Sequence, residues 1–286
     1  MFDDLGAPVD LSYPPRRVVS LVPSLTEAIA LSVPGVLVGA TDWCVRPPGL
    51  QVERVRGTKN PDLAKIRALE PDLVVVNEEE NRKLDVERLR ASGVDVWVTK
   101  IDSVDEAVAS LERFFTEALG LKETPAWLRT ARKVWDVSGI DSEGPAFPPS
   151  NLGRFNAPTA RPSTQLSSPA TINGSGLRVA IPIWRDPWIW VGAGTYASDL
   201  VSRLGWTSAG ADFGERYPHA DVAEVLHTSG GVDAVLLPDE PYAFGPYDGP
   251  DAFPETHTVL VPGRSLFWYG PAMCDARQAL EAAVRS

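Results

Sequence analysis

A short apolar strand near the start of the chain runs through a Pro-Ser turn directly into a helix, and this succession constrains the fold most. It is the segment Arg17-Val-Val-Ser-Leu-Val-Pro-Ser-Leu-Thr-Glu27. Apolar, mostly β-branched runs predict strands over 18–22, 36–40, 73–76 and 94–99, with helices over 26–31, 62–69 and 80–91 between them. The alternation resumes after residue 177, with strands over 178–183, 234–237 and 259–261 and helices over 195–204, 220–226 and 271–284. This spacing predicts βαβ units, so the fold class is α/β with parallel sheets.

Two helix starts carry recognisable capping residues. Ser24 and Glu27 stand at the N-cap and N3 spacing of a capping box, while Asn60 and Pro61 fit an N-cap and a first helical position. A strand that leads into a helix start aims backbone N–H groups at the crevice beyond the strand's carboxyl end, where open α/β sheets bind ligands. Pro23 and Ser24 are therefore either a plain helix cap or a direct ligand contact.

The middle of the chain lacks strand patterns. Residues 103–118 form a strongly amphipathic helical pattern and residues 125–137 form a second one. Residues 138–176 are rich in Pro, Gly and Ser and keep no apolar period, which predicts a disordered insertion. We therefore divide the chain into an N-terminal lobe (1–102), linker helices (103–137), the insertion (138–176) and a C-terminal lobe (177–286).

Composition narrows the class of partner. The formal net charge of -11 argues against nucleic acid, which needs clustered Lys and Arg. No run approaches the roughly 20 apolar residues of a membrane span. Cys44 and Cys274 lack the spacing of a zinc site and are expected to be buried thiols, so we predict neither a bound metal ion nor a covalent cofactor. Residues 1–5 carry no secretory signal, which indicates a cytoplasmic protein as the sequence stands, or a periplasmic or cell-surface one if the recorded start lacks a leader.

Aromatic side chains gather where predicted strands end, and converging rings suit a flat, largely apolar ligand. Trp43, Trp184 and Trp188 follow predicted strands, Trp268 and Tyr269 precede the last predicted helix, and Tyr217 is a further candidate. Ring stacking adds about 0.5–1.5 kcal/mol per pair, whereas association costs ~4–15 kcal/mol, so polar anchors are also required. The candidates, each expected at a strand end or a helix start, are Lys59, Asn60, Asn77, Arg82, Arg185 and Tyr269.

No catalytic constellation is recognisable, since the chain has neither a Gly-x-Ser-x-Gly elbow nor a Walker loop. Gly192-Ala-Gly-Thr-Tyr-Ala197 matches a relaxed dinucleotide fingerprint and leaves an oxidoreductase open. The acidic run Glu78-Glu79-Glu80 is either a solvated helix start or a docking surface for a basic partner.

Five segments follow one another in a specific order and spacing. They are Asp3-Asp-Leu-Gly6, Pro15-Arg-Arg-Val-Val-Ser-Leu-Val-Pro-Ser-Leu-Thr-Glu27, Gly57-Thr-Lys-Asn-Pro-Asp62, Leu69-Glu-Pro-Asp-Leu-Val-Val-Val-Asn-Glu-Glu-Glu-Asn-Arg82 and Trp268-Tyr-Gly270. Together they resemble the substrate-binding proteins with a helical backbone, specifically the cobalamin-binding group that serves ABC importers. The resemblance implies two Rossmann-like lobes joined by one rigid helix, with the ligand held in the cleft between them.

The resemblance also implies roles for single residues. Its cleft contacts correspond here to Pro23, Ser24, Trp43, Trp268 and Tyr269. Members of the group dock on a permease through one acidic residue per lobe, and the nearest acidic residues here are Glu78, Glu79, Glu80 and Glu224. The cobalamin binder has tryptophans near the positions of Thr58 and Asn77, which this chain lacks, so haem, another corrinoid or a ferric siderophore stays open as ligand.

The sequence therefore predicts a non-catalytic, monomeric receptor for a bulky metal chelate, most simply a corrinoid, associated with an ABC permease. Two alternatives remain at this point. One is a dinucleotide-dependent oxidoreductase that uses residues 192–197, and the other is a cytoplasmic corrinoid carrier or sensor.

Overall fold

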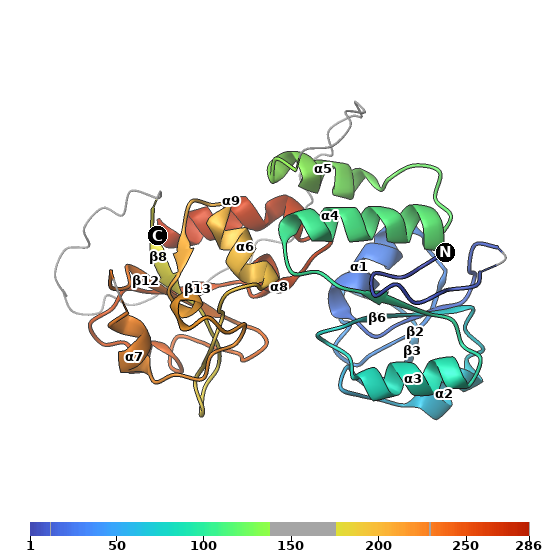
Figure 1. The fold of residues 1–286 in the computed structure, drawn as a ribbon, viewed down its shortest axis with the longest axis horizontal. Coiled ribbons are helices and arrows are strands. Elements are labelled where there is room, and N and C mark those ends of the chain that lie inside the picture. Colours follow the sequence, from blue (N-terminus) through green and yellow to red (C-terminus); the bar gives the residue numbers. More distant parts are fainter. Residues whose placement is uncertain (12, 138–175, 229, 286) are drawn as a thin grey trace.

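The computed structural model describes residues 1–11, 13–137, 176–228 and 230–285, so the predicted insertion lies outside the described residues except for Gly176. Two parallel sheets lie side by side, one built from each half of the chain (Figure 1). The first has the order β3-β2-β1-β6-β7 and comprises Glu53–Arg54, Leu37–Ala40, Val18–Ser20, Leu73–Asn77 and Val96–Thr99. The second has the order β11-β8-β12-β13 and comprises Thr207–Ser208, Arg178–Ala180, Ala234–Pro238 and Thr258–Val261. The predicted α/β class with parallel sheets is confirmed.

Both sheets have their first strand in an interior position. Strand β1 lies between β2 and β6, and strand β8 lies between β11 and β12. The connections leave these central strands in opposite directions, which creates a topological switch point at the carboxyl edge of each sheet. Two switch points, one per lobe, are the places where such sheets bind ligands.

Helices cover both faces of the first sheet. Helices α2 (Leu63–Ala68) and α3 (Lys83–Ala91) lie on the face opposite α1 (Pro23–Ser32) (Figure 1). Alternate residues of each strand pack on opposite faces, which is why the strands read as continuous apolar runs. In the second lobe, α6 (Tyr196–Ser202) and α9 (Met273–Val284) pack on one face and α7 (Val222–Leu226) on the other. The remaining short elements are η2 (Ala209–Phe213), η3 (Pro250–Ala252) and α8 (Arg264–Phe267).

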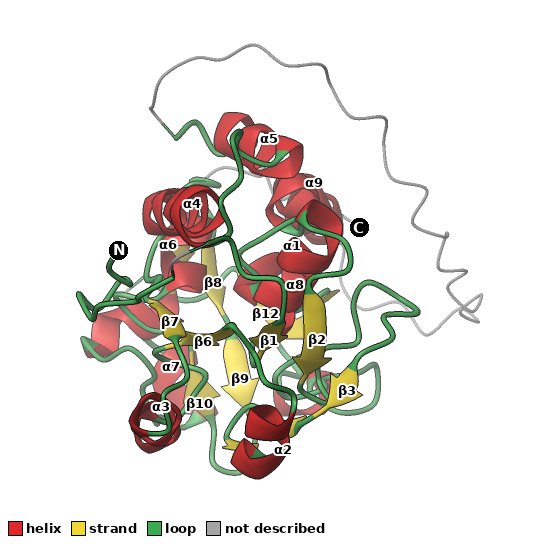
Figure 2. Ribbon diagram, turned by 90° about the vertical axis from the view of Figure 1, so that its right-hand side faces the viewer, coloured by secondary structure: helices red, strands yellow, loops and turns green. Residues whose placement is uncertain are grey.

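Three helices, α4, α5 and α9, run along one side of the molecule and connect the two lobes. Helix α4 (Val104–Arg113) continues as the π-helical η1 (Phe114–Ala118), and α5 (Ala126–Val134) returns antiparallel to it, beside α9 (Figures 1 and 2). The start of α4 is held by the other lobe, since its first backbone N–H donates to Asp199 at 2.8 Å and Asp105 pairs with Arg203 at 2.7 Å. One apolar cluster extends from the first sheet through these helices into the second sheet. Because separating the lobes would expose this cluster, it resists large relative motion.

Several predicted boundaries were wrong for identifiable reasons. Helix α1 begins at Pro23 with Val22 as N-cap, so Ser24 is not a cap, and the Glu27 side chain pairs with Arg264 instead of closing a capping box. Proline suits the first helical position because its missing N–H needs no partner there. Asn60 and Pro61 form β5, antiparallel to β4 (Arg56–Gly57), while Asp62 caps α2 by accepting from the Lys65 backbone N–H at 3.0 Å.

The strand predicted over 178–183 is two strands. Strand β8 ends at Ala180, and β9 (Pro182–Trp184) pairs antiparallel with β10 (Ile189–Trp190) in a hairpin of its own. Pro182 has no backbone N–H with which to extend the ladder to β12. The hairpin turns the chain away from the second sheet, and its turn packs on residues 242–251 of the same lobe.

Gly270 of the second lobe packs directly against α1 of the first, and a side chain there is expected to destabilise the fold. Its φ is +149°, and a Cβ would lie 3.2 Å from the Ser24 carbonyl oxygen of α1. Gly270→Ala should lower the free energy of unfolding by about 1–3 kcal/mol, measured by urea denaturation. Gly245→Ala is the control, because a Cβ at that position would have no neighbouring atom within 4 Å. Equal stability of the two variants would contradict this account of the contact.

Candidate ligand-binding cleft

A cleft of about 900 Å³ lies between the lobes, beyond the carboxyl ends of β1, β6 and β12. The first lobe lines it with Pro23, Ser24, Trp43, Thr58, Lys59, Asn77, Glu79, Glu80 and Ile101. The second lobe contributes Ile183, Val191, Tyr196, Ala197, Tyr217, Asp239, Glu240, Pro241, Ala243, Phe267, Trp268 and Tyr269. The switch points of both sheets therefore open into one shared space, which is the geometry expected of a ligand site.

The first turn of α1 brings a polar group to this cleft. Pro23 occupies the first helical position, and Ser24 follows with only 3% of its surface exposed. Among the described residues, Ser24 Oγ has no hydrogen-bond partner of acceptable geometry. A buried hydroxyl without a partner costs free energy, so Ser24 is available to a bound molecule.

The turn after β6 presents two carboxyl groups. Asn77 Oδ1 accepts the backbone N–H groups of Glu79 and Glu80 at 2.9 and 3.1 Å, and Asn77 Nδ2 donates to the Thr99 carbonyl at 3.1 Å. Lys59 Nζ donates to the Glu79 carbonyl at 2.6 Å. Asn77 and Lys59 thus shape the turn with their polar atoms, and the turn places Glu79 and Glu80 in the cleft.

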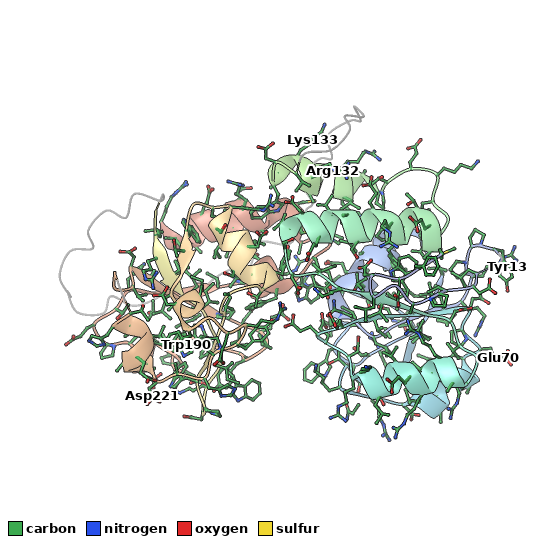
Figure 3. The ribbon with its side chains drawn as sticks, in the orientation of Figure 1. Tyr13, Glu70, Arg132, Lys133, Trp190 and Asp221 are labelled. Atoms are coloured by element: carbon green, nitrogen blue, oxygen red, sulfur yellow. The ribbon has the colours of Figure 1, made fainter. Side chains whose placement is uncertain are left out.

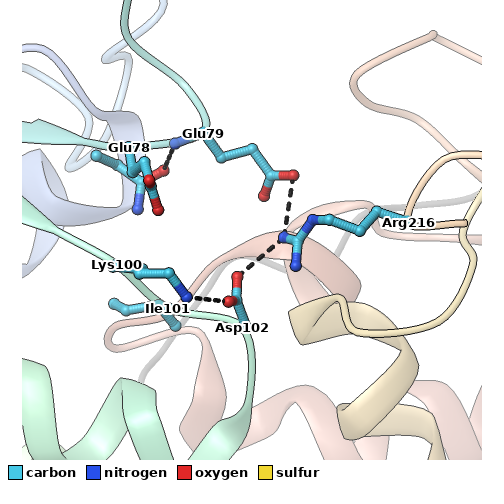
Figure 4. Close-up of a pocket in the computed structure, with 7 residues that line it drawn as sticks. Glu78, Glu79, Lys100, Ile101, Asp102 and Arg216 are labelled. Carbon is cyan, nitrogen blue, oxygen red and sulfur yellow. Dashed lines mark hydrogen bonds and ion pairs between the residues drawn. The ribbon is translucent and has the colours of Figure 1, made fainter. Parts of the chain in front are cut away.

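Polar contacts join the lobes around the cleft. The Tyr269 hydroxyl donates to Glu80 Oε1 at 3.1 Å, and Arg264 Nη2 lies 2.9 Å from both carboxylate oxygens of Glu27. At one rim, beside a smaller cavity of about 340 Å³, Arg216 of the second lobe reaches Asp102 at 2.9 Å and Glu79 at 3.4 Å (Figure 4). These contacts hold the cleft walls at a fixed separation.

Burial raises the pKa of several groups in the cleft, including one carboxyl group from each lobe. It raises the pKa of Glu80 to about 7, with a further contribution from the charge of Glu79. Burial also raises the pKa of Glu240 to about 7, helped by the neighbouring Asp239. The pKa of Tyr269 is well above its usual value because the hydroxyl is buried and faces Glu80, and the nearby Ser24 hydroxyl partly offsets this rise. One carboxyl group from each lobe therefore changes its charge near neutral pH.

Aromatic rings from both lobes supply most of the apolar lining. Trp43 of the first lobe is 68% exposed, whereas Trp268 and Tyr269 of the second are 9% and 5% exposed. The Tyr269 ring meets the Tyr196 ring edge-on at 5.8 Å between centroids, and the Arg264 guanidinium lies 5.6 Å from the Trp268 centroid. Neighbours fix the rings of the second lobe, while Trp43 is free to move onto a bound molecule.

Five residues of the predicted set lie outside the cleft lining. Asn60 belongs to the exposed β4–β5 hairpin, and Arg82 is the exposed N-cap of α3. Arg185 pairs with Asp248 and, at 2.7 Å, with Asp251. Trp184 packs edge-on against Tyr242, and Trp188 stacks on Trp190 and Phe244 in the outer core of the second lobe, where Figure 3 labels Trp190.

Sequence reasoning missed part of the lining. Asp239, Glu240 and Pro241 follow β12 in the same way that residues 78–80 follow β6, so the rule used for the first lobe could have found them. Tyr196 and Ala197 open α6, and Ile183 lies on the unexpected β9. Glu79 and Glu80, predicted as docking residues, line the cleft, whereas Glu78 lines only the smaller cavity and Glu224 lines neither.

The possible dinucleotide fingerprint has the wrong surroundings. Residues 192–197 connect the antiparallel β10 to α6, whereas the fingerprint requires a parallel strand that leads into a helix. A Cβ on Gly192 would lie 2.0 Å from the Glu215 carbonyl oxygen, and Arg216 donates to the Gly194 carbonyl. These glycines pack against residues 215–216, which leaves no open loop for a pyrophosphate.

Two further features of the described residues bear on function. No group of three or more His, Cys, Asp or Glu side chains within these ranges could hold a metal ion. Of the helices that the structure describes, none has the length and apolar character required to cross a membrane.

Comparison with known proteins places the chain beside two-lobed binding proteins. No family model matches the sequence. A vitamin B12-binding protein of Vibrio cholerae is 29% identical over 102 residues, which is 35% of this chain and 37% of that protein. The chain therefore aligns with little more than a third of the length of this curated relative.

Solved structures match over nearly the whole chain. The periplasmic vitamin B12-binding protein of Vibrio cholerae superposes with a TM-score of 0.64 at 18% identity, covering 96% of this chain and 99% of the other. A periplasmic haem-binding protein of Pseudomonas aeruginosa superposes with a TM-score of 0.68 at 18% identity, covering 95% and 93%. The predicted resemblance to helical-backbone substrate-binding proteins is confirmed, and the fold is that of these two-lobed proteins.

The carboxyl group of Glu80 should make stability depend on pH. Its raised pKa means that the folded state holds a proton that the unfolded state loses near pH 4.5, so stability falls as pH rises from about 4.5 to about 7. Glu80→Gln should remove this part of the decline, on the order of 2–3 kcal/mol, in urea titrations between pH 5 and 8. The same decline in wild type and variant would contradict the assignment. Glu78→Gln, a change at an exposed neighbour, is the control.

Proposed function

We propose that this chain is a non-catalytic receptor that binds a bulky metal chelate in the cleft between its lobes. The class of ligand that fits best is a corrinoid, with haem and ferric siderophores as the other chelates of comparable size. The observation that carries the proposal is the cleft of about 900 Å³, which both switch points and aromatic rings from both lobes line. This volume suits a large ligand, since small-molecule sites span roughly 300–1,000 Å³.

The relatives support this class of ligand. The curated relative is named for vitamin B12, and the superposed structures are titled for vitamin B12 and haem. Both ligands are flat macrocycles that surround a metal ion, and such a disc offers two apolar faces to indole and phenol rings. Stacking on Trp268 and Tyr269 from one lobe and on Trp43 from the other would enclose it.

A binding role without catalysis is consistent with the rigid frame. The shared apolar cluster and the contacts of Glu80, Glu27 and Arg216 preorganise the cleft, which lowers the entropic cost of binding. The cleft offers carboxyl, hydroxyl and amide groups that can anchor the rim of a chelate. None of them forms a nucleophile and base pair among the described residues, so the groups present bind and orient.

The proposed role in import requires a permease and a location outside the cytoplasmic membrane, as in the periplasmic neighbours. The exposed Glu224 of the second lobe and the exposed Glu78 of the first remain the predicted docking residues. In this arrangement Glu79 and Glu80 serve the ligand instead of the permease.

Direct titration tests the proposal. Tryptophan fluorescence and calorimetry with cyanocobalamin, haemin and a ferric siderophore should reveal saturable binding of at least one chelate at one site per chain. Quenching is expected because indole rings line the cleft. Absence of binding by every chelate, or retention of a dinucleotide through purification, would overturn the proposal.

Trp268 should contribute directly to affinity. Trp268→Ala removes a ring that is 9% exposed at the cleft wall, and we expect a loss of at least about 1 kcal/mol, or roughly fivefold in Kd. Tyr247→Ala is the matched control, since this aromatic ring is 95% exposed and lies outside the lining. Unchanged affinity of a folded Trp268→Ala protein would remove this ring from the site.

A further inference from the structure

The charges in the cleft are one-sided. Glu79, Glu80, Asp239 and Glu240 line it, whereas Lys59 is the one basic residue among the lining residues that the structure describes. Glu79 has Arg216 as an ion-pair partner, and Lys59 donates to a backbone carbonyl. Within the described ranges, no ion pair includes Glu80, Asp239 or Glu240. A bound molecule therefore meets more carboxyl groups than basic groups, and three of these carboxyl groups form no ion pair within the described ranges.

The pair Glu80 and Glu240 spans the cleft. Glu80 follows β6 in the first lobe, and Glu240 follows β12 in the second. The groups that face Glu80 are the Tyr269 hydroxyl, Glu79, Lys59 and Glu240. Those that face Glu240 are Asp239, Arg264, Arg46 and Trp268. Arg264 is already held by Glu27, so it cannot fully neutralise Glu240.

Ser24 gives independent evidence that a polar ligand group belongs here. Its hydroxyl is buried, lines the same cleft beside the Tyr269 hydroxyl and makes no hydrogen bond of good geometry among the described residues. A hydroxyl can donate and accept, and it carries no charge. It can therefore complement a polar group on the ligand, and the carboxyl groups of the cleft decide which charge that group can carry.

Primary amides and carboxylates on a ligand differ in how they can hydrogen-bond to the carboxyl groups of the cleft. A primary amide has two N–H donors and a carbonyl acceptor, so it can pair with a carboxyl group in either protonation state. A ligand carboxylate can pair with Glu80 or Glu240 only while that residue holds a proton, and otherwise two like charges face each other in a partly buried site. Since both residues change charge near pH 7, carboxylate ligands should be disfavoured increasingly above that pH.

Resting on the proposed function, we infer that Glu80 and Glu240 select the chelate by the groups on its rim. The cleft takes a macrocycle that bears primary amides and rejects the same macrocycle that bears carboxylates. The selection acts from both lobes at once, because each lobe supplies one of the two residues.

The affinities of two corrins that share a ring but differ in the groups on its rim distinguish the effect of rim charge from that of ring shape. Cobinamide carries amides on its rim, and cobyrinic acid carries carboxylic acids in their place. Calorimetry at about pH 8 should give a Kd at least about tenfold lower for cobinamide, and the ratio should shrink at about pH 6, where Glu80 and Glu240 are mostly protonated.

The double variant Glu80→Gln/Glu240→Gln tests whether these two residues cause the preference for cobinamide over cobyrinic acid. It removes both ionisable groups and should reduce the cobinamide preference at pH 8 to within about threefold, mainly through tighter binding of cobyrinic acid. Glu78→Gln/Glu224→Gln makes the same change in charge at exposed positions outside the cleft and should keep the wild-type ratio. Circular dichroism melts establish that each variant is folded, and the single variants replace the double one if it is not.

The outcomes separate this inference from the proposed function. Equal affinity for the two corrins, or a ratio that Glu80→Gln/Glu240→Gln leaves unchanged, overturns the inference alone. Binding of haemin or a ferric siderophore without either corrin also overturns it and retains the proposed chelate receptor. Binding of no chelate overturns both.

Discussion

The structure depends on one continuous apolar cluster that passes from the first sheet, through the long helices, into the second sheet. Because this cluster is shared, the two switch points cannot separate without exposing apolar surface to water. The cleft between them is therefore a fixed property of the fold. Polar contacts of Glu27, Glu80 and Arg216 with the opposite lobe set its width more finely.

A rigid cleft changes what binding requires from the side chains. A receptor that closes widely must offset the cost of ordering its lobes, whereas preorganised walls leave more of the contact energy for affinity. Here the second lobe holds its rings in place through Tyr196 and Arg264, and the exposed Trp43 of the first lobe is left to adapt. Adaptation by one ring is a small motion, compatible with a frame that moves little.

The sequence predicted the features that local residue patterns determine, such as strands and helices. It did not predict the contacts that tertiary packing determines. The alternation of strands and helices predicted the fold class and both parallel sheets. The rule for strand ends predicted that Pro23 and Asn77 lie at the cleft, and the family resemblance predicted the same of Trp268. The capping pattern at Ser24 misled because Pro23 takes the first helical position, and the partner of Glu27 lies 237 residues away in sequence, at Arg264. The tryptophans around Arg185 looked like a binding motif, but Asp248 and Asp251 hold the arginine, and Trp188 packs into the outer core. Contacts between residues so far apart in the sequence cannot be predicted from a short segment.

Partly buried carboxyl groups between the two lobes lower the stability of the fold, so selection for stability alone would not keep them. Glu80 and Glu240 lose hydration on folding, and replacing them with amides would avoid this penalty. The unpartnered Ser24 hydroxyl adds a second cost at the same place. Glu80 and Glu240 form no ion pair among the described residues, and a ligand that donates hydrogen bonds to them and to Ser24 would offset these costs. The destabilised groups themselves thus indicate the chemistry of the molecule that the cleft accepts.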